Sequence, residues 1–136
     1  PIVRAMMKAV NDGDLDGFKP FIADDCRIAI NSIEVSRSGV GSSGWDLWAD
    51  AISDTRAAYP DIHWDLYDEL SGTDDDQRKI AIRFVSTITQ DGEEEDFEVA
   101  CFGVVEKKQL ISWHQVADPE IYNRRRSHTG EQPLES

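Results

Sequence analysis

The sequence predicts one α+β domain, in which three helices pack against one face of an antiparallel sheet. Two segments carry apolar residues at helical spacing, and four later segments alternate between apolar and polar residues. The chain has 136 residues, which is the length of one ordinary domain. The expected element order is α-α-β-α-β-β-β, with one further β-strand at the end. Residues 1–123 are expected to form the domain, and residues 124–136 a polar tail.

A helical hairpin is expected at the start of the chain. Apolar residues recur every fourth position from Ile2 to Val10 and form one helix face. Gly13 suits the left-handed conformation that ends many helices. A short second helix is expected within residues 14–22.

A longer third helix is expected after a loop rich in glycine and serine, residues 36–44. Ser43 and Asp46 match the capping box that begins many helices. Pro60 ends the helix, because the residue before a proline avoids the helical region. The inner face carries large side chains at steps of three and four residues: Trp45, Trp48, Ile52, Thr55 and Tyr59.

The strands are expected in residues 26–30 and in consecutive segments after the third helix, the last from Leu110 to Ala117. In the first of these later segments, Ile62, Trp64, Leu66 and Leu70 alternate with polar residues, which predicts that they share one face. Consecutive hairpins give an antiparallel sheet with one face covered by helices.

Composition restricts the partners of the chain. Its net charge is −13, and such a surface repels nucleic acid and anionic membranes, so neither is expected as a partner. No apolar run approaches the roughly 20 residues of a membrane-spanning helix. The segment Pro1–Arg4 lacks the layout of a signal peptide, so a cytoplasmic location is expected.

Neither a cofactor nor a metal is expected. Cys26 and Cys101 are the only cysteines, and both stand among apolar residues, which favours buried free thiols over a disulfide framework. No cysteine and histidine spacing matches a zinc site, and no glycine-rich phosphate loop is present.

Four short motifs, in the same order, resemble those of the nuclear-transport-factor-2-like superfamily, which includes ketosteroid isomerases and SnoaL-like polyketide cyclases. Residues 10–16 are similar to the family motif N-x-G-D-hydrophobic-D, and residues 21–25 to F-A-D-D. Tyr59-Pro60-Asp61 is similar to F-P-D. Residues 104–113 resemble the closing hairpin of the family, which an Asp follows, here Asp118. The similarity spans residues 2–122.

This resemblance implies a cone-shaped domain whose curved sheet encloses an apolar pocket. Family ligands are small and hydrophobic, and homodimers through the sheet are common. Family members include isomerases, aldol-type cyclases, epoxide hydrolases, dehydratases and non-catalytic binding proteins. The fold therefore does not fix the chemistry.

The catalytic positions implied by the resemblance hold other residues. Met6, Ile30 and Ala100 stand where steroid isomerases carry a Tyr and two Asp, so we reject that reaction. Gln115 stands where the cyclases and epoxide hydrolases carry an Asp. An amide does not titrate near neutral pH and cannot act as a general base, although it can orient a carbonyl or a water.

The remaining candidates for catalysis are His114, Gln115 and Asp118. His114 and Gln115 are neighbours on one strand, so their side chains point to opposite faces. If Gln115 lines the pocket, His114 faces outward, and a slip or bulge of one residue reverses this. Asp118 precedes Pro119, a pair that commonly initiates a turn.

The candidates for ligand binding are Trp48, Tyr59, Trp113, Asn31 and Arg83. The aromatic residues are expected to form a pocket wall. Asn31 either binds the ligand by hydrogen bonds or makes a turn at the end of its strand. Arg83 either holds an anionic ligand or pairs across strands with Glu98 or Asp65.

Two functions follow from these observations. One is an enzyme of the cyclase, isomerase or hydratase type with a non-standard residue set. The other is a non-catalytic module for ligand binding or dimerisation, which the loss of the family acids favours. Titratable side chains around the cavity distinguish the two, since an enzyme of this type needs them.

Overall fold

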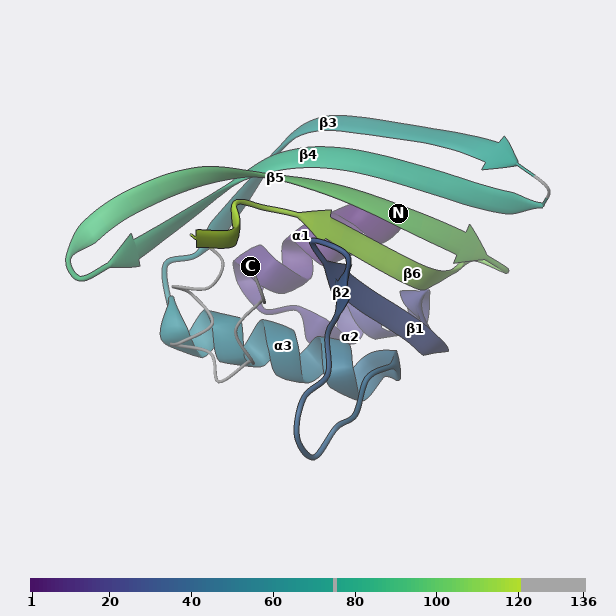
Figure 1. Ribbon diagram of the computed structural model, residues 1–136, viewed down its shortest axis with the longest axis horizontal. Helices are drawn as coiled ribbons and strands as arrows, with labels where there is room; N and C mark the ends of the chain where they lie inside the picture. Colours follow the sequence, from purple (N-terminus) through teal and green to yellow (C-terminus); the bar gives the residue numbers. More distant parts are fainter. Residues whose placement is uncertain (75, 121–136) are drawn as a thin grey trace.

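The computed structural model describes residues 1–74 and 76–120 (Figure 1). The expected domain end at 123 and the tail 124–136 lie outside the described residues. The elements in chain order are α1 (Ile2–Asp12), α2 (Leu15–Phe18), a 3-10 turn (Lys19–Phe21), β1 (Ile22–Ile30), β2 (Ile33–Glu34), α3 (Gly44–Ala58), β3 (His63–Asp74), β4 (Gln77–Gln90), β5 (Glu93–Glu106) and β6 (Gln109–Val116).

The six strands form one curved sheet in the order β2-β1-β6-β5-β4-β3. Figure 1 shows this sheet arching over α1, α2 and α3, which all lie on its concave side. The core fills the space between the two layers and includes Met6, Leu47, Phe84 and Trp113. The expected α+β class, with three helices on one face of a curved sheet, is confirmed. No helix among the described residues is long and apolar enough to cross a membrane.

One strand pair differs from the expected antiparallel sheet. β1 and β6 are parallel, with Ile28 opposite Trp113 and Ile30 opposite Gln115. Hairpin reasoning covers strands that follow each other in the chain, whereas these two are joined through α3 and four further strands. A long connection of this kind permits parallel pairing. The pair brings the ends of β1 and β6 together.

A glycine with positive φ marks the end of α1 and the start of α3. Gly13 ends α1 in the expected left-handed conformation, with φ 77°. At the start of α3, Ser43 makes no side-chain cap hydrogen bond, so the expected capping box does not form. Instead Gly44, with φ 82°, allows close packing on β1, since a Cβ there would lie 2.8 Å from the carbonyl oxygen of Asp24.

A bulge in β3 changes which residues face the core. Leu66 stands opposite Phe84, but Asp68 stands opposite Arg83, so one residue is inserted between them. Such an insertion reverses the facing of the residues that follow. The expectation that Leu70 shares the inner face of Trp64 is therefore wrong: Leu70 points outward and is 72% exposed.

Candidate functional site

A partly open cavity of about 90 Å³ lies between α1 and α3 and the concave face of the sheet. Its lining comes from α1, β1, the segment after β2, α3, β3 and β6: Met6, Val10, Ile28, Ile30, Val35, Trp48, Ala51, Ile52, Thr55, Trp64 and Gln115. Most of this surface is apolar. Side-chain polar atoms enter the lining from Thr55, Gln115 and two indoles.

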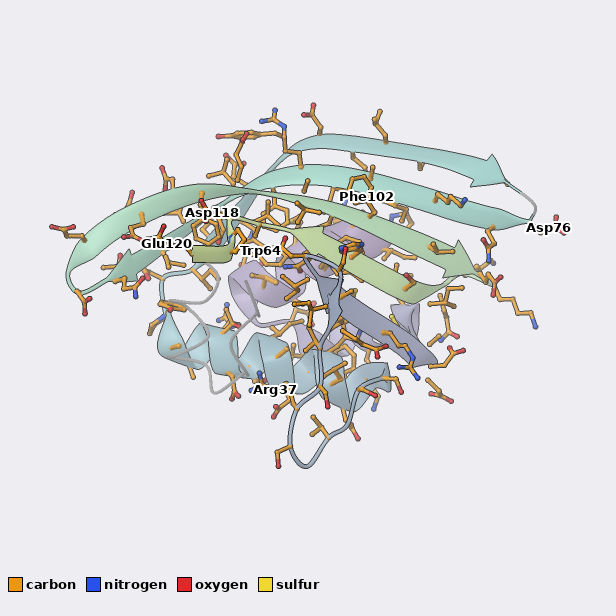
Figure 2. All side chains as sticks on the ribbon, viewed as in Figure 1. Arg37, Trp64, Asp76, Phe102, Asp118 and Glu120 are labelled. Carbon is orange, nitrogen blue, oxygen red and sulfur yellow. The ribbon has the colours of Figure 1, made fainter. Side chains whose placement is uncertain are left out.

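Arg37 holds the segment after β2 against α3. This segment brings Val35 to the cavity. The guanidinium of Arg37 is almost fully buried and donates to Asp50 at 2.5 Å and also to Asp54. Figure 2 shows Arg37 beside α3 at the base of the molecule. The ion pairs tie one wall of the cavity to the helix that forms another wall.

Gln115 faces into the cavity with a fixed orientation of its amide. The indole Nε1–H of Trp113 donates to Oε1 of Gln115 at 3.1 Å. An indole N–H only donates, so Oε1 must face Trp113 and the NH₂ group takes the other direction. Trp113 is buried and lies over Gly103, its cross-strand neighbour. The NH₂ group has no hydrogen-bond partner among the described residues.

Trp64 contributes a second N–H donor. Its Nε1 is buried without a hydrogen-bond partner in the part of the chain that the structure describes. The ring stacks on Phe84, with centroids 4.1 Å apart and planes at 26°. Asn11 holds the Trp64 backbone through two hydrogen bonds, donating to its carbonyl oxygen at 3.0 Å and accepting from its N–H at 2.7 Å. Helix α1 therefore fixes the backbone that carries this indole.

The α3 wall consists of Trp48, Ala51, Ile52 and Thr55. Trp48 meets the rings of Trp113 and Phe18 edge to face, at centroid distances of 6.2 and 5.5 Å. Burial raises the pKa of the Cys26 thiol to about 12, although a hydrogen bond with Trp48 acts in the opposite direction. Thr55 donates its hydroxyl hydrogen to the carbonyl oxygen of Ala51 at 2.8 Å. Only the lone pairs of Thr55 remain for a ligand.

The titratable candidates lie outside this cavity. His114 stands opposite Phe102 on the outer face of the sheet, and its Nε2 accepts from the backbone N–H of Ser32 at 3.0 Å. Asp118 is exposed and accepts from the backbone N–H of Glu120 at 2.9 Å, which fits the turn that the pair Asp118-Pro119 predicts. Within residues 1–74 and 76–120, no Asp, Glu, His, Lys, Arg, Cys or Tyr lines the cavity.

The structure separates the ligand-binding candidates. Trp48 lines the cavity, and Trp113 lies behind Gln115. Tyr59 is buried at the end of α3 but is not part of the lining. The amide of Asn31 donates to the carbonyl oxygen of Ala117 at 2.9 Å and accepts from its N–H at 3.0 Å, so its hydrogen-bonding groups hold β6 beside β1.

Arg83 lies on the outer face, away from the cavity. Its guanidinium donates to Asp68 at 2.8 Å and to Glu98, and it stands 5.2 Å from the ring centroid of Tyr67. Glu98 was one of the two expected partners. The bulge in β3 places Asp68, rather than Asp65, opposite Arg83. The geometry fits a cross-strand ion pair and gives no support to an anion clamp in the cavity.

Sequence reasoning missed three residues of this site. Trp64 was read as an apolar strand residue, and its N–H was not considered. Asn11 lies just before Gly13, where the sequence suggests only a role in ending the helix. Its hydrogen bonds to the Trp64 backbone have no sequence signal. Gly103 does have a sequence signal, because a glycine inside a strand often marks a close approach of another group.

No family profile and no curated protein matches the chain, whereas solved structures do. An NTF2-like protein of unknown function from Burkholderia pseudomallei has a TM-score of 0.69 over 90% of this chain and 92% of its own, at 15% identity. The chain has the NTF2-like fold. The fold that the resemblance implied is thereby confirmed.

Two further structural neighbours have descriptions that concern a function or a ligand. IdmH from Streptomyces antibioticus, provisionally described as a polyketide cyclase, has a TM-score of 0.67 over 93% of this chain and 96% of its own, at 18% identity. TerC, co-crystallised with polyporic acid, has a TM-score of 0.68 over 90% and 93%, at 8% identity. Identities this low show the fold alone, so the function has to be argued from this cavity.

Proposed function

We propose that this NTF2-like domain binds a small, mostly apolar molecule in the cavity below Gln115. The observation that carries the proposal is the lining itself, which is apolar apart from a few oriented polar groups. An apolar cavity of about 150 Å³ can hold one benzene molecule. A cavity of about 90 Å³ is smaller, so it encloses a short branched chain or part of a ring, with the rest of the ligand at the open side.

The proposal is binding, without acid–base catalysis by the cavity side chains. A general acid or base must reach the reacting group, directly or through one water. In the described lining, the position where the resemblance implies an Asp is held by Gln115, and His114 lies on the other face of the sheet. The alternative of a cyclase, isomerase or hydratase has no such group in the described cavity to support it.

The test uses acetophenone and α-methylstyrene as probes, followed by ¹H–¹⁵N NMR titration. Both are single rings with a three-atom branched substituent, so part of either one can enter the cavity while the rest lies at its open side. We expect both to shift the signals of cavity residues. Ala51→Leu fills the cavity and is expected to abolish binding of both probes, because Ala51 is part of the lining. Ala57→Leu, on the exposed side of the same helix, is the matched control and should bind as the wild type does.

The binding proposal is overturned if neither probe shifts the cavity signals at its solubility limit. It also fails if Ala51→Leu binds as well as Ala57→Leu, since the probe would then occupy another site.

We also propose that the chain forms a homodimer through the outer face of the sheet. Tyr67, Leu70, Phe102 and Val116 are large, exposed apolar residues on this face, and a groove there runs past Leu70, Phe102 and His114. Large apolar groups on a chain with net charge −13 indicate a surface that is covered in solution. The occupant we propose is a second copy, since three charged groups at this face, Arg83, Asp68 and Glu98, are already paired with one another within the chain.

Sedimentation equilibrium tests the dimer. The wild type is expected to sediment as a dimer and Phe102→Glu as a monomer, because the new charge would be buried in the interface. Ala57→Glu adds the same charge to an exposed position on α3 and should remain dimeric. A wild type that is monomeric at all concentrations would contradict the proposal.

A further inference from the structure

Three side chains of the lining carry N–H donors without a geometric hydrogen-bond acceptor among the described residues: the Gln115 amide and the indoles of Trp64 and Trp48. The Trp48 indole interacts with the Cys26 thiol, whose pKa it lowers, so Gln115 and Trp64 are the donors left for a ligand. The Trp64 Nε1–H is buried, and buried donors are almost always paired in folded proteins, because an unpaired one loses its hydration without compensation. The Gln115 side chain is half-buried. Nothing else in the described lining accepts from these two donors: the Thr55 oxygen is the only other side-chain acceptor, and it belongs to a hydroxyl bonded to Ala51.

We propose that the ligand carries a neutral carbonyl oxygen, which accepts a hydrogen bond from the Gln115 amide, with the Trp64 indole as a second donor to the ligand. This inference rests on the proposed binding function and names the chemical class of the ligand. The rest of the molecule is apolar, in keeping with the other lining residues.

The orientation of the Gln115 amide is fixed by the protein before the ligand arrives. Trp113 can only donate, so its bond at 3.1 Å keeps Oε1 on its side. Trp113 in turn is held by its position over Gly103 and by the edge of Trp48. A donor held in this way loses little side-chain freedom on binding, which favours affinity.

The Trp64 donor is fixed by different contacts. Phe84 holds the plane of the indole through stacking, and Asn11 holds the backbone through two hydrogen bonds. α1 and β6 therefore position the two donors independently. A change in one is not expected to displace the other.

The lining also indicates why the acceptor is neutral. Within the described residues, neither Lys nor Arg lines the cavity. A carboxylate would lose its hydration there without a counter-charge, which is far more costly than burying a ketone. Arg83, the cation once expected to receive an anion, is bound to two carboxylates on the opposite face.

The experiment compares acetophenone with α-methylstyrene, in which a CH₂ group replaces the carbonyl oxygen. We expect the ketone to bind about tenfold more tightly, equal to about 1.4 kcal/mol. Benzoate should bind more weakly than the ketone. In Gln115→Leu the preference for the ketone should fall to about twofold or less, while α-methylstyrene binds as before. Trp64→Phe should reduce the preference in part, and Trp45→Phe, at a half-buried indole outside the lining, should retain it.

The outcomes separate this inference from the binding proposal. If both probes bind equally to the wild type and Ala51→Leu abolishes both, the carbonyl inference is overturned and the apolar cavity stands. If benzoate binds more tightly than acetophenone, the neutral acceptor is overturned. If neither probe binds, both proposals fail. If Gln115→Leu does not fold, the ratio of the dissociation constants of the two probes for the wild type decides. The NMR signal of the Trp64 indole proton gives a second readout, since it should move downfield with acetophenone and not with α-methylstyrene.

Discussion

Gly103→Ala tests how the sheet positions Gln115. A Cβ at position 103 would lie 2.9 Å from Cε3 of Trp113 and 3.0 Å from Cδ1 of Leu110. Carbon atoms pack best at about 3.5–4.0 Å, so the Trp113 ring would have to withdraw from β5 by roughly half an ångström or more. Its hydrogen bond to Gln115 would then lengthen from 3.1 Å.

The magnitude follows from two opposing effects. Overpacking a well-filled core costs about 1–3 kcal/mol. Replacing glycine by alanine restricts the unfolded chain and returns about 0.4–1 kcal/mol. We expect Gly103→Ala to lose about 1–2 kcal/mol of unfolding free energy. Gly72→Ala is the matched control, because Gly72 is also in a strand and a Cβ there would meet nothing within 4 Å.

Urea unfolding followed by tryptophan fluorescence measures the difference. The slope of unfolding free energy against urea is about 1–3 kcal/mol per molar for small proteins, so the midpoints of the two variants should differ by about 1 M. Gly103→Ala should also lose most of the preference for acetophenone over α-methylstyrene. Equal midpoints for Gly103→Ala and Gly72→Ala would refute the account of Trp113 packing.

Three further predictions concern other parts of the molecule. Asn11→Ala removes two hydrogen bonds to the Trp64 backbone and should lower the unfolding free energy by about 1–3 kcal/mol in urea, and an unchanged midpoint would contradict this. Lys108 has φ 66° in the two-residue turn between β5 and β6, a conformation that favours glycine. Lys108→Gly should therefore raise the unfolding free energy in urea by about 1 kcal/mol, and a lower unfolding free energy would contradict the turn assignment. Cys26 and Cys101 are buried, and burial raises both thiol pKa values, that of Cys26 to about 12. Iodoacetamide at pH 8 should modify neither thiol until denaturant is added. Because the pKa of Cys26 is raised in the folded state, its contribution to stability is complete below about pH 9 and is lost as the pH rises from 9 towards 12. A urea midpoint that stays constant over that range would contradict this.

Local patterns predicted much of the fold. The four-residue spacing from Ile2 to Val10, the stop at Gly13 and the aromatic stripe of α3 all depend on neighbours in the chain. Alternation along β6 placed Gln115 and His114 on opposite faces, which the structure also shows. Such features depend on period and turn chemistry, which a sequence displays directly.

The remaining features depend on contacts between distant segments. The parallel pairing of β1 with β6 follows from the path of the whole chain, and hairpin reasoning does not reach it. The bulge before Asp68 has no clear sequence signal, yet it decides the partner of Arg83 and the exposure of Leu70. The free N–H of Trp64 becomes visible only when its surroundings are known.

The most direct test of the account is a crystal structure of the protein grown with acetophenone. We predict the ring in the cavity against Trp48 and Ile52, with the ketone oxygen within hydrogen-bonding distance of Nε2 of Gln115. A probe found only in the outer groove beside Phe102, with the cavity below Gln115 empty, would contradict it.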